Sequence, residues 1–272
     1  MSKKSETGSF LWFLVKLVII VVAFRSFVVS PFSIPSESMQ PRLLIGDYLF
    51  VSKWSYGYSR FSFPFHPDLF SGRVLGGLPE RGDVVVFAAP RNQGEDWIKR
   101  VIGLPGDTVQ MRGGVVYLNG RAIPKRRVDD LVIPVTANMI AAARADRALS
   151  PCFRQDFEEN DAKGQRFCRY PRFRETLPNG KSYEVLDLIR SEADDTQPYI
   201  VPEGHLFVMG DNRDRSADSR FAIERSGVGM LPVENLVGKA MVSFFSTDGS
   251  ASWLLPWTWF TAARFSRIGE GF

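Results

Sequence analysis

Cysteine and histidine are scarce in this chain of 272 residues, which contains two of each. Two cysteines are too few for a disulfide-rich scaffold, and two histidines leave no cluster with the spacing of a zinc site. The sequence therefore predicts neither a metal site nor a cofactor.

A large charge of one sign is also missing. The 34 basic residues nearly balance the 30 acidic ones, which leaves a net charge of +4. Nucleic-acid-binding proteins concentrate positive charge, so the composition does not favour a nucleic-acid partner. Hydrophobic residues make up 44% and charged residues 24%, close to globular averages. A chain of this length forms one large domain or two small ones.

Long hydrophobic runs are absent except at residues 10–29, where the run is interrupted only by Lys16, Arg25 and Ser26. Its length matches a single transmembrane helix, and both charged side chains lie close enough to an end to reach the lipid headgroups. A cleavable signal peptide is the alternative. The run is long for one, however, lacks an A-x-A cleavage pattern and continues into Pro31.

The residues before this run favour one orientation. Lys3 and Lys4 precede it, and positive charge is retained on the cytoplasmic side. We therefore expect residues 1–9 to be a cytoplasmic N-terminus and the rest of the chain to be a body on the outer side.

The body begins with short runs rich in β-branched and aromatic residues, separated by Gly, Pro, Asn and Asp, which is typical of strands. A first series predicts a β meander and covers residues 83–87, 97–102, 108–111 and 115–118. A second series, at 205–209 and 239–245, has to pair with the first to complete a sheet. We expect a mostly β protein with one large antiparallel sheet built from residues 30–120 and 198–247.

Residues 121–197 interrupt these two series. The segment is charged, contains a helix-like stretch at 140–149 and holds both cysteines. We expect a smaller inserted subdomain of α/β type. Cys152 and Cys168 either form a disulfide, which an oxidising compartment favours, or remain free thiols.

The tail, residues 248–272, is rich in aromatic and basic side chains. Such a tail either rests in a membrane interface, where aromatic rings and arginines are favoured, or packs as ordinary core. We favour the interface, because the helix before the body would already hold the tail near lipid. The residues concerned are Trp253, Trp257, Trp259, Phe260, Arg264, Phe265 and Arg267.

A nucleophile and a base are suggested by two segments far apart in the chain. Pro35 and Pro41 restrict the backbone around Ser36 and Ser38, although most serines in such loops are solvated turn residues. Lys99 lies in an apolar strand in which alternation places it on one face. Burial there would lower the pKa of its amine from about 10.4, so that the neutral form could accept a serine proton.

Other interpretations of these bases stay open. Lys99 can be an ordinary surface lysine. His66 and His205 are alternative bases. His66 lies in an aromatic loop and His205 begins a strand, however, and histidines at such positions are more typically surface or packing residues.

A third segment, residues 210–220, follows the predicted strand at 205–209 and contains three Asp and three Arg. Asp and Arg pair in rigid forks that can brace a site, and Ser216 can hydrogen-bond a nearby amine. The alternative is an exposed charged turn.

Four segments together resemble the characteristic boxes of bacterial type I signal peptidase, or leader peptidase, a family of membrane serine peptidases with a Ser/Lys dyad. They are PSESM at 35–39, RGDVVVF at 81–87, IKRVIGLPGD at 98–107 and GDNRDRSADSR at 210–220. Their order and spacing agree with the family from residue 32 to 246, apart from the insertion. Arg42 and Trp97 stand where the family more often has Thr and Tyr.

The resemblance implies a role for each matching residue. Ser38 would be the nucleophile and Lys99 the general base, and Ser36 would complete the oxyanion hole with the Ser38 backbone N–H. Ser216 would orient the Lys99 amine. Supporting ion pairs would involve Asp211, Arg213, Asp218 and Arg220, and the substrate pockets would be lined by Phe32, Ile34, Pro35, Met39, Leu43, Val86, Trp97 and Ile98. The family's insertion often holds a disulfide, which would match Cys152 and Cys168.

The resemblance also implies a function and a location. The enzyme would remove the N-terminal signal peptides of exported preproteins by cutting after small residues of the Ala-x-Ala type, through an acyl-enzyme. It would cross the bacterial inner membrane once, with the catalytic domain on the periplasmic face, in contact with the lipid bilayer and near the secretion translocon. Neither nucleic acid nor a cofactor would take part.

Two alternatives remain at this point. One is a Ser/Lys peptidase of narrower use, such as a conjugation-type processing enzyme or a self-cleaving regulator, although no segment resembles the DNA-reading helix-turn-helix that a regulator needs. The other is a membrane-tethered β module that binds partners and has no catalytic activity.

Overall fold

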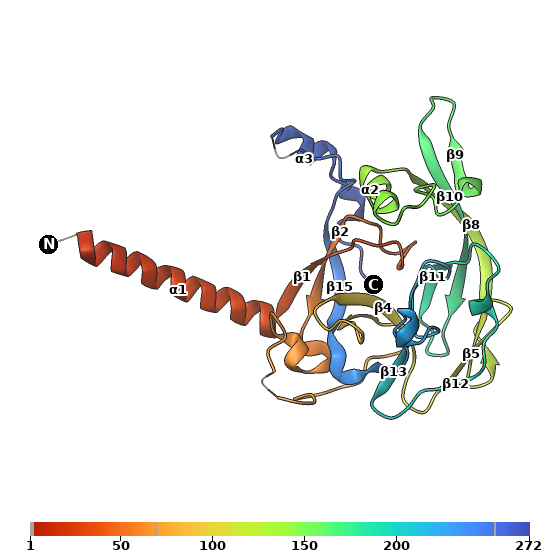
Figure 1. Cartoon of the computed structure of the whole chain (residues 1–272), viewed down its shortest axis with the longest axis horizontal. Coiled ribbons are helices and arrows are strands. Elements are labelled where there is room, and N and C mark those ends of the chain that lie inside the picture. Colours follow the sequence, from red (N-terminus) through yellow and green to blue (C-terminus); the bar gives the residue numbers. More distant parts are fainter. Residues whose placement is uncertain (1–2, 69, 253) are drawn as a thin grey trace.

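The computed structural model describes residues 3–68, 70–252 and 254–272, so Trp253 lies outside the described residues. A long N-terminal helix leaves a body built mainly of strands (Figure 1). The predicted fold class, mostly β with one apolar helix at the start, is confirmed.

The helix α1 spans Lys3–Phe27. Its apolar part, Gly8–Phe27, is 20 residues long, enough to cross a bilayer, and only 6% of it is buried against protein. The predicted helix over residues 10–29 ends earlier than expected, because Val29 begins the strand β1 (Val29–Ser33) and pairs with Ser52 of the next strand. Valine fits a helix or a strand, and the available strand partner decides which one forms here.

The main sheet has seven antiparallel strands in the order β1-β2-β15-β3-β4-β13-β14. Beyond β1, its strands are β2 (Asp47–Ser52), β3 (Val84–Ala88), β4 (Asp96–Gly103), β13 (His205–Met209), β14 (Leu231–Pro232) and β15 (Leu236–Ser246). The expected pairing of the two series occurs, since β15 lies beside β3 and β13 beside β4.

Both faces of this sheet are covered at its centre. In β3 the side chains of Val84 and Val86 join one hydrophobic cluster, and those of Val85 and Phe87 join another on the opposite face. A strand buried on both sides has a continuous apolar sequence, as this one does. Central β3 therefore anchors the sheet on which the candidate site is built.

A second sheet shows that the predicted meander is wrong after β4. This sheet has the order β12-β5-β6-β7, with strands Tyr199–Ile200, Thr108–Arg112, Val115–Leu118 and Arg121–Ala122. Strand β5 does not pair with β4, because β3 and β13 already occupy both edges of β4. The chain instead turns at 104–107, where the Asp107 carboxylate accepts a hydrogen bond from the Leu104 N–H at 2.8 Å.

The inserted segment forms a third sheet and one helix. Its strands are β8 (Lys125–Pro134), β9 (Glu158–Asn160), β10 (Arg166–Thr176) and β11 (Ser182–Leu186), with β10 paired to the other three. The helix α2 spans Ala137–Ala145, earlier than the expected 140–149. Thr136 sets this start, because its side chain accepts a hydrogen bond from the Met139 N–H.

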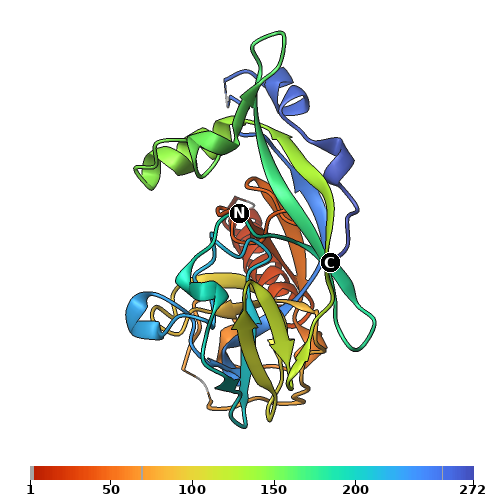
Figure 2. The same ribbon diagram turned by 90° about the vertical axis from the view of Figure 1, so that its right-hand side faces the viewer.

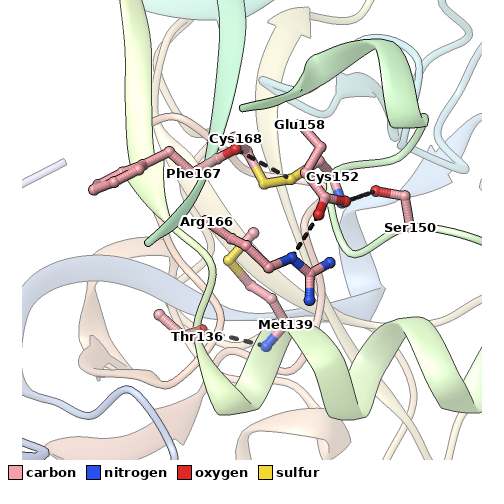
Figure 3. The surroundings of a disulfide bond; sticks show 8 residues. All are labelled: Thr136, Met139, Ser150, Cys152, Glu158, Arg166, Phe167 and Cys168. Carbon is pink, nitrogen blue, oxygen red and sulfur yellow. Dashed lines mark hydrogen bonds and ion pairs between the residues drawn. A yellow bond between two sulfur atoms is a disulfide. The ribbon is translucent and has the colours of Figure 1, made fainter. Parts of the chain in front are cut away.

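Cys152 and Cys168 are joined by a disulfide, with their Cα atoms 5.3 Å apart. Figure 3 shows the disulfide close to Met139 of α2, and these three side chains belong to one buried cluster with Tyr170 and Leu186. Glu158 accepts hydrogen bonds beside it from Ser150 and Arg166. The bridge and the cluster together hold α2 against β10.

After β15 the C-terminal tail forms the short helix α3 (Trp257–Thr261) and a turn at 265–267, and it then returns to β15, where Gly271 bridges Val242. Trp257 and Phe260 are 65% and 73% exposed, so these rings are not core residues. The expectation that Arg264 and Arg267 reach toward lipid is wrong. Both guanidinium groups bind the buried carboxylate of Asp47, at 3.2 and 2.8 Å.

Candidate active site

Ser38 lies in the loop that connects β1 to β2, and the loop is fixed at both ends. The Ile34 N–H donates to the Asp47 carbonyl at 2.8 Å, and the Asn212 N–H donates to the Ser38 carbonyl at 3.0 Å. Ser38 itself is 6% exposed. The loop therefore presents a nearly buried hydroxyl in a defined position.

Lys99 reaches this hydroxyl from β4. Its Nζ lies 3.0 Å from Ser38 Oγ and donates to the Ile98 carbonyl at 2.9 Å. Burial lowers the pKa of the Lys99 amine to about 8, although the carboxylates of Asp218 and Asp211 oppose this shift. A lysine with such a pKa is neutral in part of the molecules near pH 7 and can then accept a proton from the serine.

The two histidines contact other groups. The Nδ1 atom of His66 lies 2.7 Å from the Gln93 carbonyl, and that of His205 lies 2.9 Å from the Glu203 carbonyl. The structure thus brings Lys99, and neither histidine, to Ser38.

Two further serines surround the pair. Ser36 Oγ lies 3.3 Å from Ser38 Oγ. Ser216 is buried, and no hydrogen bond joins its hydroxyl to the Lys99 amine, so the expected contact is not formed here. The Ser216 side chain contacts Asp218 instead and helps to lower the pKa of that carboxyl. Gly210 makes the close packing possible, since a Cβ there would lie 2.3 Å from Ser216 Oγ and 2.5 Å from the Ser38 carbonyl oxygen.

Buried ion pairs surround the Lys99 amine. Asp211 binds Arg100 through two hydrogen bonds of 2.7 and 2.6 Å, and Arg220 binds Asp218 at 2.9 and 3.0 Å. Burial alone would raise the pKa of Asp218, but Arg220 and the Gly210 N–H hold it below its usual value. Each of the two carboxylates next to Lys99 is therefore already paired with an arginine.

A cavity of about 550 Å³ opens beside the two serines and Lys99. Six of the eight expected pocket residues line it: Phe32, Ile34, Pro35, Val86, Trp97 and Ile98. Met39 and Leu43 do not line it, because they lie behind it in the hydrophobic cluster that also contains Ile34. Polar and charged residues line the rest of the cavity, and besides the two serines and Lys99 they include Glu95, Asp96 and Arg215.

Comparison with known proteins identifies the family of this chain. Residues 7–245 match the family described as signal peptidase, peptidase S26. This chain belongs to that family. Its resemblance to type I signal peptidases is therefore confirmed, and it is an enzyme that cleaves signal peptides, which excludes the alternative of a binding module.

The relatives of this signal peptidase extend over nearly its whole length. A signal peptidase I of Rickettsia prowazekii (strain Madrid E) is 34% identical over 283 residues, covering 97% of this chain and 92% of the relative. One of Rickettsia canadensis (strain McKiel) is 36% identical over 240 residues, covering 85% and 77%. A solved signal peptidase I of Enterococcus faecalis V583 is 27% identical and covers 60% of this chain and 97% of its own, with a TM-score of 0.29.

Several residues of this signal peptidase site were not expected from the sequence. Arg100 binds Asp211, and Glu175 in β10 binds Arg213 at 2.6 Å. The sequence offered a reason to include Arg100, because it directly follows Lys99 in the same box and strand alternation places it on the opposite face of the strand. The sequence offered no such reason for Glu175, since a single Glu in a charged insertion resembles any surface residue.

Glu37 and Arg215 form another unexpected contact. Glu37 stands between the two serines in the sequence. The Arg215 Nε donates to a Glu37 carboxylate oxygen at 3.2 Å. Burial raises the pKa of Glu37, and Arg215 opposes that shift. Their positions inside two of the four boxes were the only available signal.

We predict that Glu175→Gln lowers the free energy of unfolding by about 3–5 kcal/mol, because it leaves the Arg213 charge buried without a counter-ion. Both side chains are at most 2% exposed. Urea unfolding of the detergent-solubilised enzyme measures this change.

Glu159→Gln is the matched control, since Glu159 pairs with Arg169 at a site where both are nearly half exposed. That variant should change the free energy of unfolding by less than about 1 kcal/mol. Equal effects of the two substitutions would contradict a structural role for Glu175.

Proposed function

We propose that Ser38 is the nucleophile and Lys99 the general base of this signal peptidase. The observation that carries the proposal is the 3.0 Å approach of two buried groups, one of which has a pKa of about 8. The neutral amine takes the Ser38 proton as Oγ attacks the carbonyl carbon of the scissile bond. The Ser36 hydroxyl and the Ser38 N–H donate to the oxyanion that forms.

The second half of the reaction uses the same two groups. The Lys99 ammonium gives its proton to the leaving amine, and an acyl-enzyme ester on Ser38 remains. Lys99 then takes a proton from a water molecule that attacks this ester, and Ser38 recovers its proton. In this proposal Ser216, which is buried next to Asp218, steadies the amine as it rotates between these steps.

The proposed specificity is for Ala-x-Ala type sites. The side chains of Phe32, Val86, Trp97 and Ile98 narrow the cavity next to Ser38. Met39 and Leu43 pack behind this wall, in the buried cluster that contains Ile34. A small residue before the scissile bond fits such a pocket, and a large one would displace buried side chains.

Removing either member of the proposed dyad should abolish cleavage of a purified preprotein. Ser38→Ala and Lys99→Ala are expected to lose on the order of 10⁶-fold in kcat, as is typical when a nucleophile or its base is removed. Thermal melting should show that both variants fold. Normal cleavage by Lys99→Ala would refute the dyad and make His205 the next base to test.

The pH dependence offers an independent test. The active form of Lys99 is the neutral amine, so kcat/KM should be low at acidic pH, rise with pH and level off above the pKa of about 8. Hydrolysis of a peptide between pH 5 and 10.5 measures this profile. A rate that still climbs in proportion to hydroxide at about pH 10 would exclude a lowered pKa.

The proposed membrane arrangement has α1 crossing the inner membrane once, with residues 1–9 in the cytoplasm. The body then lies on the periplasmic face, and its catalytic domain consists of residues 30–120 and 198–247, with 121–197 inserted. Strand β1 is the only element between α1 and the Ser38 loop, so the site lies close to the bilayer. This is where a signal peptide held in the membrane near the translocon would present its cleavage site.

The tail, residues 248–272, adds a second contact with lipid in this arrangement. Figure 1 shows α3 extending toward the side from which α1 leaves the body. Its exposed rings include Trp257 and Phe260. Aromatic side chains of this kind favour the headgroup region of a bilayer.

Replacing Trp257 and Phe260 together by alanine should therefore slow the processing of a precursor embedded in vesicles more than that of a soluble peptide. The ratio of the two rates, compared with wild type, is the quantity to measure. An unchanged ratio would show that α3 does not contribute to binding the membrane.

A further inference from the structure

A second cavity of about 550 Å³ lies on the far side of Ser36 from the cavity already described. The two cavities share four lining residues, Pro35, Ser36, Arg215 and Ala217. They therefore meet beside the nucleophile, with the expected pocket residues on one side and a different set of residues on the other.

One wall of the second cavity comes from the inserted segment. Helix α2 contributes Ala142, Ala143 and Ala145, whose small side chains leave space for another chain. Phe221 and Arg225 line the cavity from the segment that follows the charged box. Figure 2 shows α2 and the turn that contains Arg225 on the same side of the body.

Arg215 lines both cavities and is held by two acidic residues. Its guanidinium pairs with Glu37 at 3.2 Å and with Asp146, just after α2, at 3.4 Å. It also lies over the ring of Phe153, next to the disulfide, at 5.2 Å. Because α2 is held by the disulfide and its buried cluster, this wall is preformed rather than assembled by a ligand.

We infer that the second cavity binds the segment of the preprotein that follows the scissile bond, which becomes the N-terminus of the mature protein. The inference rests on the proposed function. A peptide bond placed over Ser38 has its acyl side in the first cavity, and the chain must continue past Ser36. The second cavity adjoins that point and has the volume of a ligand site.

The occupant is an extended peptide. The alanine wall of α2 lets a backbone approach closely, which a wall of large side chains would prevent. The insertion would thus contribute directly to binding substrate, through α2, and would hold the leaving segment in line while Lys99 gives it a proton.

Two peptides that are identical up to the scissile bond test this inference, one with a single residue after the bond and one with about six. Wild-type enzyme in detergent should cleave the longer peptide with a higher kcat/KM. Equal values for the two peptides would overturn the inference without any variant.

Ala143→Trp should fill the cavity and lower the ratio of kcat/KM for the long peptide over the short one by about tenfold, equivalent to about 1.4 kcal/mol of lost binding. Ala141→Trp is the control, because Ala141 is an exposed residue of the same helix that does not line the cavity. It should keep the wild-type ratio, and melting curves confirm that both variants fold.

If the two tryptophan variants give the same ratio, α2 is not the binding wall. Failure of the proposed dyad gives a different result, since Ser38→Ala would then cleave both peptides as well as wild type does.

Discussion

The candidate site depends on one constraint, the burial of Lys99 beside two carboxylates that oppose the loss of its charge. Desolvation of Lys99 lowers the pKa of its amine, while Asp211 and Asp218 act in the opposite direction. The structure limits that opposition by giving each carboxylate its own arginine, Arg100 for Asp211 and Arg220 for Asp218. If either carboxylate lost its arginine, it would stabilise the Lys99 ammonium and raise the pKa of the amine.

The seven-stranded sheet brings these groups together. Strand β4 places Lys99 on the face of the Ser38 loop and Arg100 on the other face, where it binds Asp211. Strand β13 lies beside β4, so the charged box that follows β13 reaches the end of the site. Strand β4 and the box after β13 therefore supply Lys99 and the two ion pairs next to it, Arg100–Asp211 and Arg220–Asp218.

The inserted segment contributes to the site more than its position in the sequence suggests. Glu175 of β10 neutralises the buried Arg213, and Asp146 pairs with Arg215, which in turn contacts Glu37 between the two serines. The disulfide holds this part of the insertion in place. A segment that looks separable from the catalytic domain thus supports both the charged box and the nucleophile loop.

The sequence by itself determined the apolar helix, most of the strands and the four boxes, because these depend on local composition and on alternation along the chain. Only the tertiary structure decided which strands pair and which distant charges meet. It moved β5 out of the predicted meander because β13 already occupied that edge of β4, and it bound Arg264 and Arg267 to Asp47. It also paired Glu175 with Arg213. Partners so far apart in the chain leave no local pattern, since only folding brings them together.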